Sequence, residues 1–557
     1  METLPPHVTV LDGYVDEPAC FGVPPYISPH ARNVAGVVAE LGGSVSYLTI
    51  DEWRKRSPKR EALKREGYLL VIAGALVPGK YLRGTPVSLR EARQIAADFP
   101  GQSILAGSSA TYGFGVGGGR PPQGREELRS IFQHLCFLDV DAYLFDLFEK
   151  GKGTQRRKTM DEWARWPVLG AHVVRQHPDH PQPLIAEIET YHGCVRFVNG
   201  GCSFCMEPAE GAPKFRPVQQ VVDECEALAR EGVVNFRIGG QADFFTYGTT
   251  QVGQSESPAP NPDAIEALLA GIRKRCPGLR VLHIDNVDPG IVFDHPQESE
   301  RIARLVAHHC TDGNIAAFGL ETADPSVHDK NNLNVTADEC LAAMRLLNKV
   351  GAERGPTGMP KFLPGLNFIC GLPGESLATY DHNRRFLQRV LDEGLLVRRI
   401  NIRKLLEQRI AGGADTSAFF KFKEWTRANV DRPMLRRMLP VGTILRNVYL
   451  ESREGHLTYG RQIGSYPLLV GLPYDMVLDR FVDVAIVGHG ERSVTAVEHP
   501  LDVNRASLRA LTALPGVGAK RAARIVRARP FADAGAFVAA LDDADVARAV
   551  LPFVRTG

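Results

Sequence analysis

Three cysteines lie close together on one glycine-rich stretch of the chain. Cys194, Cys202 and Cys205 occur in the segment YHGCVRFVNGGCSFC (residues 191–205), with seven residues between the first pair and two between the second. Three thiolates on one loop can bind three corners of a cubane iron–sulfur cluster and leave the fourth iron without a protein ligand. A structural zinc ion would need a fourth Cys or His nearby, and His192 precedes Cys194 by only two residues. The spacing predicts a 4Fe–4S cluster, with a zinc ion or no metal as the alternatives.

The other seven cysteines are scattered, mostly within apolar or helical patterns. The N-terminus lacks the basic and apolar regions of a signal peptide, and no apolar run is long enough to span a membrane. We therefore expect a cytoplasmic protein in a reducing compartment, and interpret these cysteines as small buried hydrophobic residues. They are Cys20, Cys136, Cys225, Cys276, Cys310, Cys340 and Cys370.

The composition is that of an ordinary globular protein. The 557 residues are 44% hydrophobic and 23% charged, with a formal net charge of +2. This length exceeds what one core can organise, so we expect three or four domains. The near-balance of charge argues against a protein that coats nucleic acid by charge alone, so any basic site must be local.

A long series of strand and helix patterns surrounds the cysteine triad. Between about residues 184 and 410, apolar strand patterns alternate with helical patterns such as 218–231 and 338–349. This alternation predicts a partial or full parallel β/α barrel, whose chemistry lies at the C-terminal ends of its strands. The expected strands cover residues 184–189, 235–238, 281–284, 315–320, 366–369 and 397–402. The triad follows the first of them directly.

Three further motifs lie at the ends of later strands. They are Gly239, Gly240 and Gln241 after the second strand, Glu321 after the fourth, and Cys370 with Gly371 after the fifth. Glycine lets a ligand approach the backbone closely, but each glycine motif alone is also typical of a plain turn. Glu321 alone could be a helix N-terminal carboxylate. Four motifs in this order, each at a strand end, are more specific than any one of them.

Together these motifs resemble those of the radical S-adenosylmethionine (SAM) superfamily. The resemblance implies a 4Fe–4S cluster on Cys194, Cys202 and Cys205, with SAM chelating the open iron. In that superfamily three residues usually separate the first two cysteines, so the seven found here enlarge the first loop. The resemblance further implies SAM contacts for Phe204, Cys370 and Gly371 near the adenine, for Gly239, Gly240 and Gln241 at the methionyl amino group, and for Glu321 at the ribose hydroxyls or the substrate.

The resemblance also implies the reaction. A low-potential electron donor would reduce the cluster, SAM would be cleaved to methionine and a 5′-deoxyadenosyl radical, and that radical would abstract a hydrogen atom from the substrate. The cofactors would carry out the radical steps, and the protein would bind and orient the reactants and exclude water.

Within the superfamily the chain looks most like the methylthiotransferase and B12-type branches. Strand and helix patterns in residues 1–150 predict a Rossmann-like domain that is similar to cobalamin-binding domains. A methylthiotransferase holds a second cluster on three further N-terminal cysteines, but this region has only Cys20 and Cys136, which argues against methylthiolation. An Asp-x-His-x-x-Gly motif is absent, so a bound cobalamin would lack its usual histidine ligand and is the less favoured cofactor.

The C-terminal segment, residues 501–557, is rich in Ala and Arg and resembles a helix-hairpin-helix unit. Such a unit presents backbone N–H groups and a helix N-terminus to a nucleic-acid phosphate, and nearby cations add sequence-independent contacts. The alternative is a helical cap that binds protein. The implied nucleic-acid contacts are Gly516, Gly518, Lys520, Arg521 and Arg524.

These patterns predict an α/β protein of four domains: a Rossmann-like domain (1–150), a radical SAM core (184–425), a small β domain (426–500) and a helix-hairpin-helix domain (501–557). Residues 151–183 have the composition of a linker, in which His177 and His180 are interpreted as surface histidines. The favoured function is a radical SAM enzyme that modifies nucleic acid, in the first place RNA, with no membrane contact. The alternatives are a radical SAM enzyme for a small molecule or lipid, and a non-enzymatic nucleic-acid-binding protein with a structural metal.

Overall fold

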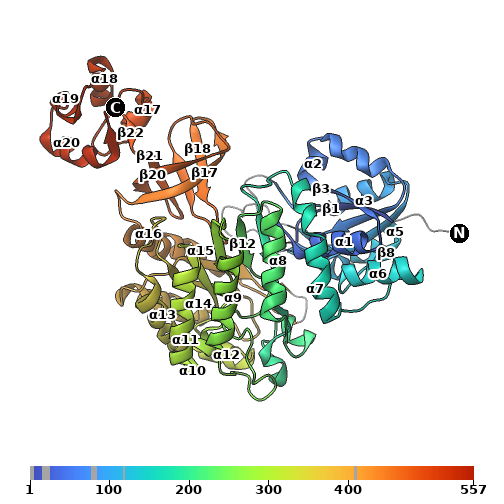
Figure 1. Ribbon diagram of the computed structural model, residues 1–557. Helices are drawn as coiled ribbons and strands as arrows, with labels where there is room; N and C mark the ends of the chain where they lie inside the picture. Colours follow the sequence, from blue (N-terminus) through green and yellow to red (C-terminus); the bar gives the residue numbers. More distant parts are fainter. Residues whose placement is uncertain (1–5, 16–25, 77–83, 117–119, 407–409, 557) are drawn as a thin grey trace.

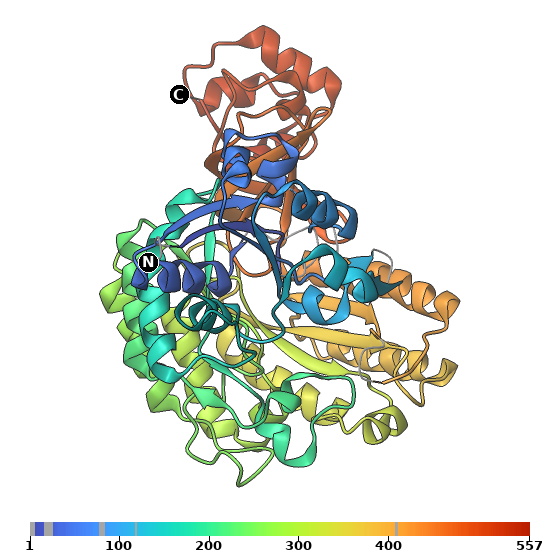
Figure 2. The ribbon, with the colours of Figure 1, turned by 90° about the vertical axis from the view of Figure 1, so that its right-hand side faces the viewer.

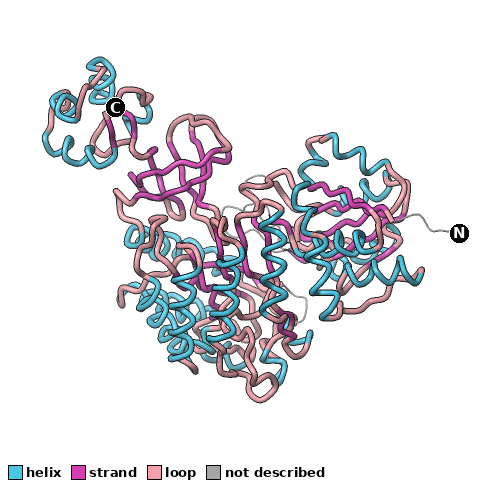
Figure 3. The backbone as a smooth tube through the Cα atoms, in the orientation of Figure 1, coloured by secondary structure: helices cyan, strands magenta, loops and turns pink. Residues whose placement is uncertain are grey.

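The computed structural model describes residues 6–15, 26–76, 84–116, 120–406 and 410–556 (Figure 1). Cys20 lies outside these residues. Along the chain, an N-terminal α/β domain is followed by a larger β/α core, a small β-barrel and a helical C-terminal domain (Figure 3). The mixed α/β fold with parallel sheets confirms the predicted fold class.

The N-terminal domain is a five-stranded parallel sheet. Its strand order is β3-β1-β4-β5-β8, with every pair parallel. One face packs on α1 (Pro29–Glu40) and α6 (Val140–Lys150), and the other on α3 (Leu89–Asp98). Alternate side chains of each buried strand fill the two cores, as expected for a sheet covered on both faces. The strands are β1 (His7–Asp12), β3 (Ser44–Thr49), β4 (Tyr68–Ile72), β5 (Gln102–Ala106) and β8 (His134–Leu135).

The core is an open β/α barrel. Two parallel sheets, β13-β12-β9-β2 and β14-β15-β16, meet through a bridge between Asn286 and Ala317. The added edge strand, β2 (Tyr26–Ile27), comes from the N-terminal part of the chain and pairs with β9. Over the described residues the sheets do not close, so the barrel is partial. The core strands are β9 (Ile185–Ile188), β12 (Asn235–Ile238), β13 (Val281–Ile284), β14 (Asn314–Glu321), β15 (Phe362–Cys370) and β16 (Arg399–Lys404).

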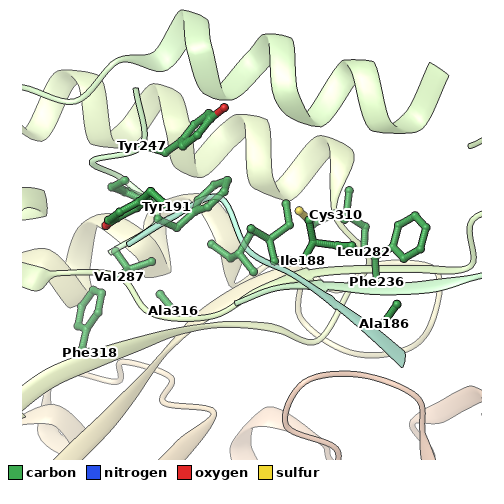
Figure 4. Packing of buried hydrophobic residues seen from close by; sticks show 14 of the residues in the cluster. Ala186, Ile188, Tyr191, Phe236, Tyr247, Leu282, Val287, Cys310, Ala316 and Phe318 are labelled. Atoms are coloured by element: carbon green, nitrogen blue, oxygen red, sulfur yellow. The ribbon is translucent and has the colours of Figure 1, made fainter. Parts of the chain in front are cut away.

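Helices cover the outside of this barrel (Figure 2). Apolar side chains of the strands, such as Ile188, Phe236 and Leu282, pack beneath them in one continuous core (Figure 4). The same core includes residues of the N-terminal domain, so the two domains are joined by a shared apolar contact. The helices are α8 (Val218–Arg230), α9 (Pro262–Arg275), α11 (Pro296–His309), α13 (Ala337–Gly351) and α14 (Leu377–Asp392).

The prediction of a linker at 151–183 is wrong. Helix α7 (Met160–Leu169) begins with a capping box of Thr159 and Glu162 and packs along α1. Trp166 is fully buried, and burial of an aromatic side chain of this size stabilises the packed helix. A 3-10 helix at Ala171–Gln176 continues the layer.

The interpretation of His177 as a surface histidine is also wrong. Its ring lies 5.8 Å from the ring of Tyr47, and burial lowers its pKa to about 3. His180 is half-buried, and its Nε2 atom lies 2.7 Å from the carbonyl oxygen of Glu231. Both histidines therefore belong to the contact between the N-terminal domain and the core.

The small β domain is a closed five-stranded barrel with the strand order β17-β18-β19-β21-β20. All neighbouring strands are antiparallel except β19 and β21, which are parallel. The expected domain start at residue 426 falls at the end of α15 (Thr416–Thr426), which continues through a π-helical turn into α16 (Arg432–Met438). The buried residues of α16 pack partly on the core and partly on the small barrel. The strands are β17 (Ile444–Glu454), β18 (Leu457–Gln462), β19 (Leu469–Leu472), β20 (Arg480–His489) and β21 (Ser493–Glu498).

The C-terminal domain consists of two pairs of short helices. A parallel pair of two-residue strands, β22 (Leu501–Asp502) and β23 (Val554–Arg555), joins its two ends. Among the described residues, no helix is long and apolar enough to cross a membrane. The helices are α17 (Leu508–Thr512), α18 (Ala519–Ala528), α19 (Ala534–Ala539) and α20 (Ala544–Val550).

Candidate active site

The cysteine triad lies on a loop that is closed by a short antiparallel strand pair. β10 (Tyr191–His192) pairs with β11 (Lys214–Phe215), so the loop that carries the cysteines begins and ends at this strand pair. The seven-residue spacing contains a 3-10 turn at Val195–Asn199 and then Gly200 and Gly201, both at positive φ (82° and 63°). A Cβ atom at Gly201 would lie 2.1 Å from Cγ of Pro208. The enlarged first loop is therefore a folded turn that only glycine can complete.

Two asparagines hold the second half of this loop. The backbone N–H of Ser203 donates to the carbonyl oxygen of Asn331 at 3.0 Å, and the side chain of Asn332 donates to the carbonyl oxygen of Gly201 at 2.9 Å. Asn331 also donates to the carbonyl oxygen of Pro373 at 2.9 Å, which ties the loop to the end of β15. Both asparagines follow α12 (Pro325–Lys330), the helix after β14, and no sequence motif identified them.

Burial controls the protonation of the thiols. It raises the pKa of Cys194 and of Cys202 to about 12, while Arg196 opposes the shift at Cys202. Among the described residues, the side chains form no group of three or more His, Cys, Asp or Glu that could already hold a metal ion. The donor set still fits an iron–sulfur cluster, because it consists of three thiols on one loop, and cluster binding would displace their protons. The assignment of the three cysteines as ligands stays a prediction.

An apolar cluster joins the last cysteine turn to the end of β15. Cys202, Phe204 and Ile369 pack against one small cluster, which consists of Val327, Leu333 and Leu372. Gly371 adopts a positive φ of 98°, and a Cβ atom there would lie 2.7 Å from the backbone nitrogen of Ala414. The fold thus brings Phe204 beside the strand end that carries the predicted adenine contacts. Cys370 itself is buried, which raises the pKa of its thiol to about 12.

The motif after β12 forms a tight turn. Gly240 has a positive φ of 78°, and a Cβ atom at Gly239 would lie 2.5 Å from Oε1 of Glu187. The buried side chain of Gln241 donates to the carbonyl oxygen of Ile238 at 3.3 Å, whereas its Oε1 atom has no hydrogen-bond partner. A buried amide oxygen without a partner is costly, which marks Gln241 as a ligand-binding candidate.

A cavity of about 450 Å³ lies at the C-terminal ends of the barrel strands. The ends of β1, β4 and β5 of the N-terminal sheet supply part of its wall through Val15, Gly74 and Ser108. The small barrel supplies Ser465 and Tyr466. Three domains therefore enclose one cavity at the edge where β/α enzymes carry their chemistry. The charged and polar residues on its core side are Arg237, Asn286, Glu321, Asn367, Arg399, Asn401 and Arg403.

Glu321 is the acidic residue of this lining. It follows a register shift in β14 and has a positive φ of 63°, which is unusual for a residue other than glycine and is typical of functional sites. Burial raises its pKa to about 8, although Arg403 opposes the shift, and its Oε2 atom has no hydrogen-bond partner. A carboxyl group that is protonated near neutral pH can donate a hydrogen bond to a ligand. The fold thus places Glu321, which was predicted from the sequence, in the wall of the cavity.

Most other cavity residues were missed by sequence reasoning. Arg399, Asn401 and Arg403 alternate with two isoleucines along β16. This period-2 pattern places the three polar side chains on one face and could have identified them. Tyr466 carried no local signal, because it comes from a loop of a different domain.

The predicted nucleic-acid residues lie in the first helix pair of the C-terminal domain. Gly516 has a positive φ of 73°, and a Cβ atom at Gly518, the N-cap of α18, would meet nothing within 4 Å. Arg521 forms ion pairs with Asp542 at 2.6 Å and with Asp543 at 3.2 Å. Arg524 pairs with Asp542 at 3.1 Å, and Lys520 is exposed. The second helix pair thus supplies carboxylates to two of the three predicted cations.

A parallel β/α barrel with three cysteines after its first strand and a polar cavity at its strand ends defines a class of cofactor-dependent enzyme. Residues 188–387 match the family model described as the radical SAM superfamily. An "uncharacterized protein" of Methanocaldococcus jannaschii is 41% identical over 503 residues, 87% of this chain and 92% of that protein. An "uncharacterized protein" of Archaeoglobus fulgidus is 39% identical over 522 residues, 91% of this chain and 93% of that protein.

The chain therefore belongs to the radical SAM superfamily and is an enzyme. Membership implies a 4Fe–4S cluster and SAM as cofactors, and it removes the alternative of a non-enzymatic binding protein.

Weaker similarities link the chain to proteins whose activity is stated. A tRNA-2-methylthio-N(6)-dimethylallyladenosine synthase of Lawsonia intracellularis is 26% identical over 195 residues, 35% of this chain and 37% of that protein. The radical SAM methyltransferase TsrM of Kitasatospora setae, solved with tryptophan and a SAM analogue, is 16% identical with a TM-score of 0.47, covering 81% of this chain and 79% of that one. The cobalamin-dependent radical SAM enzyme OxsB is 12% identical with a TM-score of 0.48, covering 76% of this chain and 56% of that one.

Proposed function

We propose that this enzyme modifies RNA, and that the small barrel and the C-terminal domain hold the polymer while the cavity receives the unit to be modified. The cluster and SAM, when bound, supply the radical that removes a hydrogen atom from the substrate. The chain's own residues bind and orient the substrate and exclude water from the cavity.

The observation that carries this proposal is the way the small barrel joins the cavity. The loop between β18 and β19 enters the open barrel, where the backbone N–H of Ser465 donates to Nδ1 of His283 at 3.1 Å. The hydroxyl of Tyr26 donates to the carbonyl oxygen of Ser465 at 3.3 Å, and Tyr466 lines the cavity. A polymer lying on the small barrel would thus pass beside the cavity.

The topology of the small barrel supports a nucleic-acid ligand. A closed five-stranded barrel in the order β17-β18-β19-β21-β20, with β19 and β21 parallel, has the strand arrangement of the oligonucleotide-binding fold. That fold binds oligonucleotides on the face of its second and third strands and on adjoining loops. In this chain those strands are β18 and β19, and the loop that joins them reaches the cavity.

The C-terminal domain adds a second contact for the polymer. The turn from Gly516 to Gly518 leads into α18, a ten-residue helix whose exposed start carries Lys520. A helix N-terminus with accessible backbone N–H groups and a nearby cation is suited to one phosphate of a nucleic-acid backbone. This turn and helix are consistent with the helix-hairpin-helix unit predicted from the sequence. The distant similarity to a tRNA-modifying synthase is consistent with RNA as substrate.

The test is anaerobic reconstitution followed by turnover on RNA. Total RNA from cells that lack the gene should stimulate release of 5′-deoxyadenosine, and digestion should reveal one nucleoside of altered mass. RNA from cells that have the gene serves as the matched control and should stimulate less, because its sites are already modified. Stimulation by a small-metabolite fraction, with none by RNA, would overturn the proposal in favour of a small-molecule enzyme.

A further inference from the structure

We infer that the carboxylate of Glu189, at the end of β9, binds the ammonium group in the methionyl part of SAM. SAM is a cofactor of this enzyme through its family. The sequence motifs predicted contacts to that ammonium group only from the turn at residues 239–241. Glu189 belongs to none of these motifs, and its role does not depend on which substrate the enzyme modifies.

Glu189 lies beside that turn because their strands are neighbours. β9 and β12 pair in parallel with Ile188 opposite Ile238, and the backbone N–H of Gly239 donates to the carbonyl oxygen of Ile188 at 3.0 Å. Glu189 and Gly239 therefore follow the last paired residues side by side, at the carboxyl ends of the two strands. In parallel β/α folds this is the edge at which ligands bind.

The carboxylate of Glu189 is buried without a hydrogen bond to its Oε2 atom. The side chain is 10% exposed, and among the described residues this oxygen has no hydrogen-bond partner. Nε2 of His192 lies 3.9 Å from it, which is longer than a hydrogen bond. A buried polar atom in this state is costly unless a ligand supplies the missing donor.

This carboxylate also carries its negative charge. Burial raises the pKa of Glu189, but His192 and Lys158 oppose this effect and hold the pKa below its ordinary value. Lys158 is itself occupied, because its Nζ atom lies 3.3 Å from Asp139 and 3.1 Å from Asp141. Glu189 therefore offers a charged acceptor to a cationic ligand group.

The backbone of Gly240 leaves an open space toward this carboxylate. Gly240 has a positive φ of 78°, and a Cβ atom built there would lie 3.4 Å from Cγ and 3.7 Å from Oε1 of Glu189. Over the described residues, no other atom beyond the adjoining residues of the turn would come within 4 Å of it. The space between the turn and Glu189 is thus suited to one small group.

Two unpartnered oxygen atoms at this place match an ammonium group. Besides Oε2 of Glu189, Oε1 of Gln241 is buried without a hydrogen-bond partner. An ammonium group has N–H donors and no acceptor, so it can satisfy acceptors of this kind. The amide of Gln241 is neutral, so Glu189 supplies the charge-assisted hydrogen bond, which is the stronger of the two.

A second acid also borders the turn but is already paired with a cation. A Cβ atom at Gly239 would lie 2.5 Å from Oε1 of Glu187, and this oxygen lies 3.6 Å from a guanidinium nitrogen of Arg237. Glu189 is therefore the acid that the geometry assigns to SAM.

The experiment measures binding to the full-length reconstituted enzyme by calorimetry, without a reductant. The two probes are SAM and an analogue of SAM that lacks the amino group. The natural enzyme should bind SAM at least about tenfold more tightly, because the analogue cannot form the charge-assisted contact. Glu189→Gln should weaken SAM binding about ten- to a hundredfold and leave binding of the analogue within about twofold. Glu189→Asp should retain part of the preference for SAM.

The matched control is Glu353→Gln, which alters an exposed ion pair with Lys361 and should leave binding of both probes unchanged. Iron content and unfolding curves show whether each variant keeps its cluster and its fold. Equal affinity of the natural enzyme for the two probes would overturn the inference. Unaltered SAM binding in Glu189→Gln would do the same, as would an equal loss of both probes. Loss of iron in Glu189→Gln would assign the carboxylate to the cluster loop instead of SAM.

Discussion

The guanidinium of Arg196 donates a hydrogen bond to Sγ of Cys202 at 3.0 Å. Arg196 belongs to the seven-residue insert between the first two cysteines, and it also reaches Oδ1 of Asn332 at 3.3 Å. The insert therefore supplies a cation to the thiol that it precedes. A positive charge beside a buried thiol favours the thiolate, which is the form that binds iron.

Removal of Arg196 should make the thiol of Cys202 harder to ionise. Burial already raises the pKa of this thiol to about 12, and Arg196→Gln should raise it further. The apo enzyme should then react severalfold more slowly with iodoacetamide at pH 9, as measured by mass spectrometry of the peptide containing Cys202. The change Arg345→Gln, at a distant exposed ion pair, should have no effect. An unaltered rate in Arg196→Gln would show that the hydrogen bond does not control this thiol.

Replacement of any triad cysteine should abolish the cluster. Cys194→Ala, Cys202→Ala and Cys205→Ala should each give colourless protein after anaerobic reconstitution, because two thiolates cannot retain a cubane cluster. Iron content and release of 5′-deoxyadenosine are the measurements. Cys276→Ala, which alters a buried cysteine at the end of α9, is the control and should keep both. Full iron content in Cys194→Ala would mean that the first ligand lies elsewhere.

Glu321 should make stability fall as pH rises. Burial raises its pKa to about 8, so the folded protein keeps a proton that the unfolded chain releases near pH 4.3. Stability is therefore lost between about pH 4.3 and 8, and Glu321→Gln should avoid this loss. In unfolding scans without SAM, the advantage of the variant should grow by on the order of a few kcal/mol from pH 5 to pH 8.5. Glu353→Gln, at an exposed ion pair with Lys361, should show no such trend.

A buried ion cluster should hold the N-terminal domain on the core. Glu224 of α8 accepts from Arg32 of α1 and from Arg216, each at 2.6 Å, and all three side chains are fully buried. Glu224→Ala leaves two buried cations without their carboxylate and should cost about 3–5 kcal/mol of unfolding free energy. Glu226→Ala, on the same helix, removes surface ion pairs with Arg230 and Arg275 and should change little. Denaturant unfolding distinguishes the two, and equal effects would contradict the role of Glu224.

The carboxylates of the C-terminal domain should limit its affinity for nucleic acid. Asp542→Asn with Asp543→Asn releases Arg521 and Arg524 from their ion pairs, so RNA should bind more tightly and with a steeper salt dependence. Lys520→Glu should have the opposite effect. Fluorescence anisotropy over a salt series measures both, and Asp263→Asn, at an exposed pair with Arg301, is the control. Unaltered binding in all variants would remove this domain from RNA recognition.

The sequence by itself determined the elements whose signals are local. The alternation of strand and helix predicted the parallel sheets and the partial barrel, and the cysteine spacing with three strand-end motifs indicated the superfamily. The segment 151–183 misled because proline and basic residues outweighed the two buried tryptophans. Trp163 stacks on His192 of the core, and Trp166 packs in the apolar core shared with the N-terminal domain. Burial against a distant segment leaves no local periodicity.

Only the tertiary structure decided how these parts meet. Arg399 and Arg403 come from one strand, Glu321 from another and Tyr466 from a separate barrel, yet they line one cavity. Other contacts also join residues that are separated in the chain. Asn332 donates a hydrogen bond to the cysteine loop, and Arg521 forms an ion pair with Asp542. Such contacts depend on the packing of whole elements, which no short window of residues encodes.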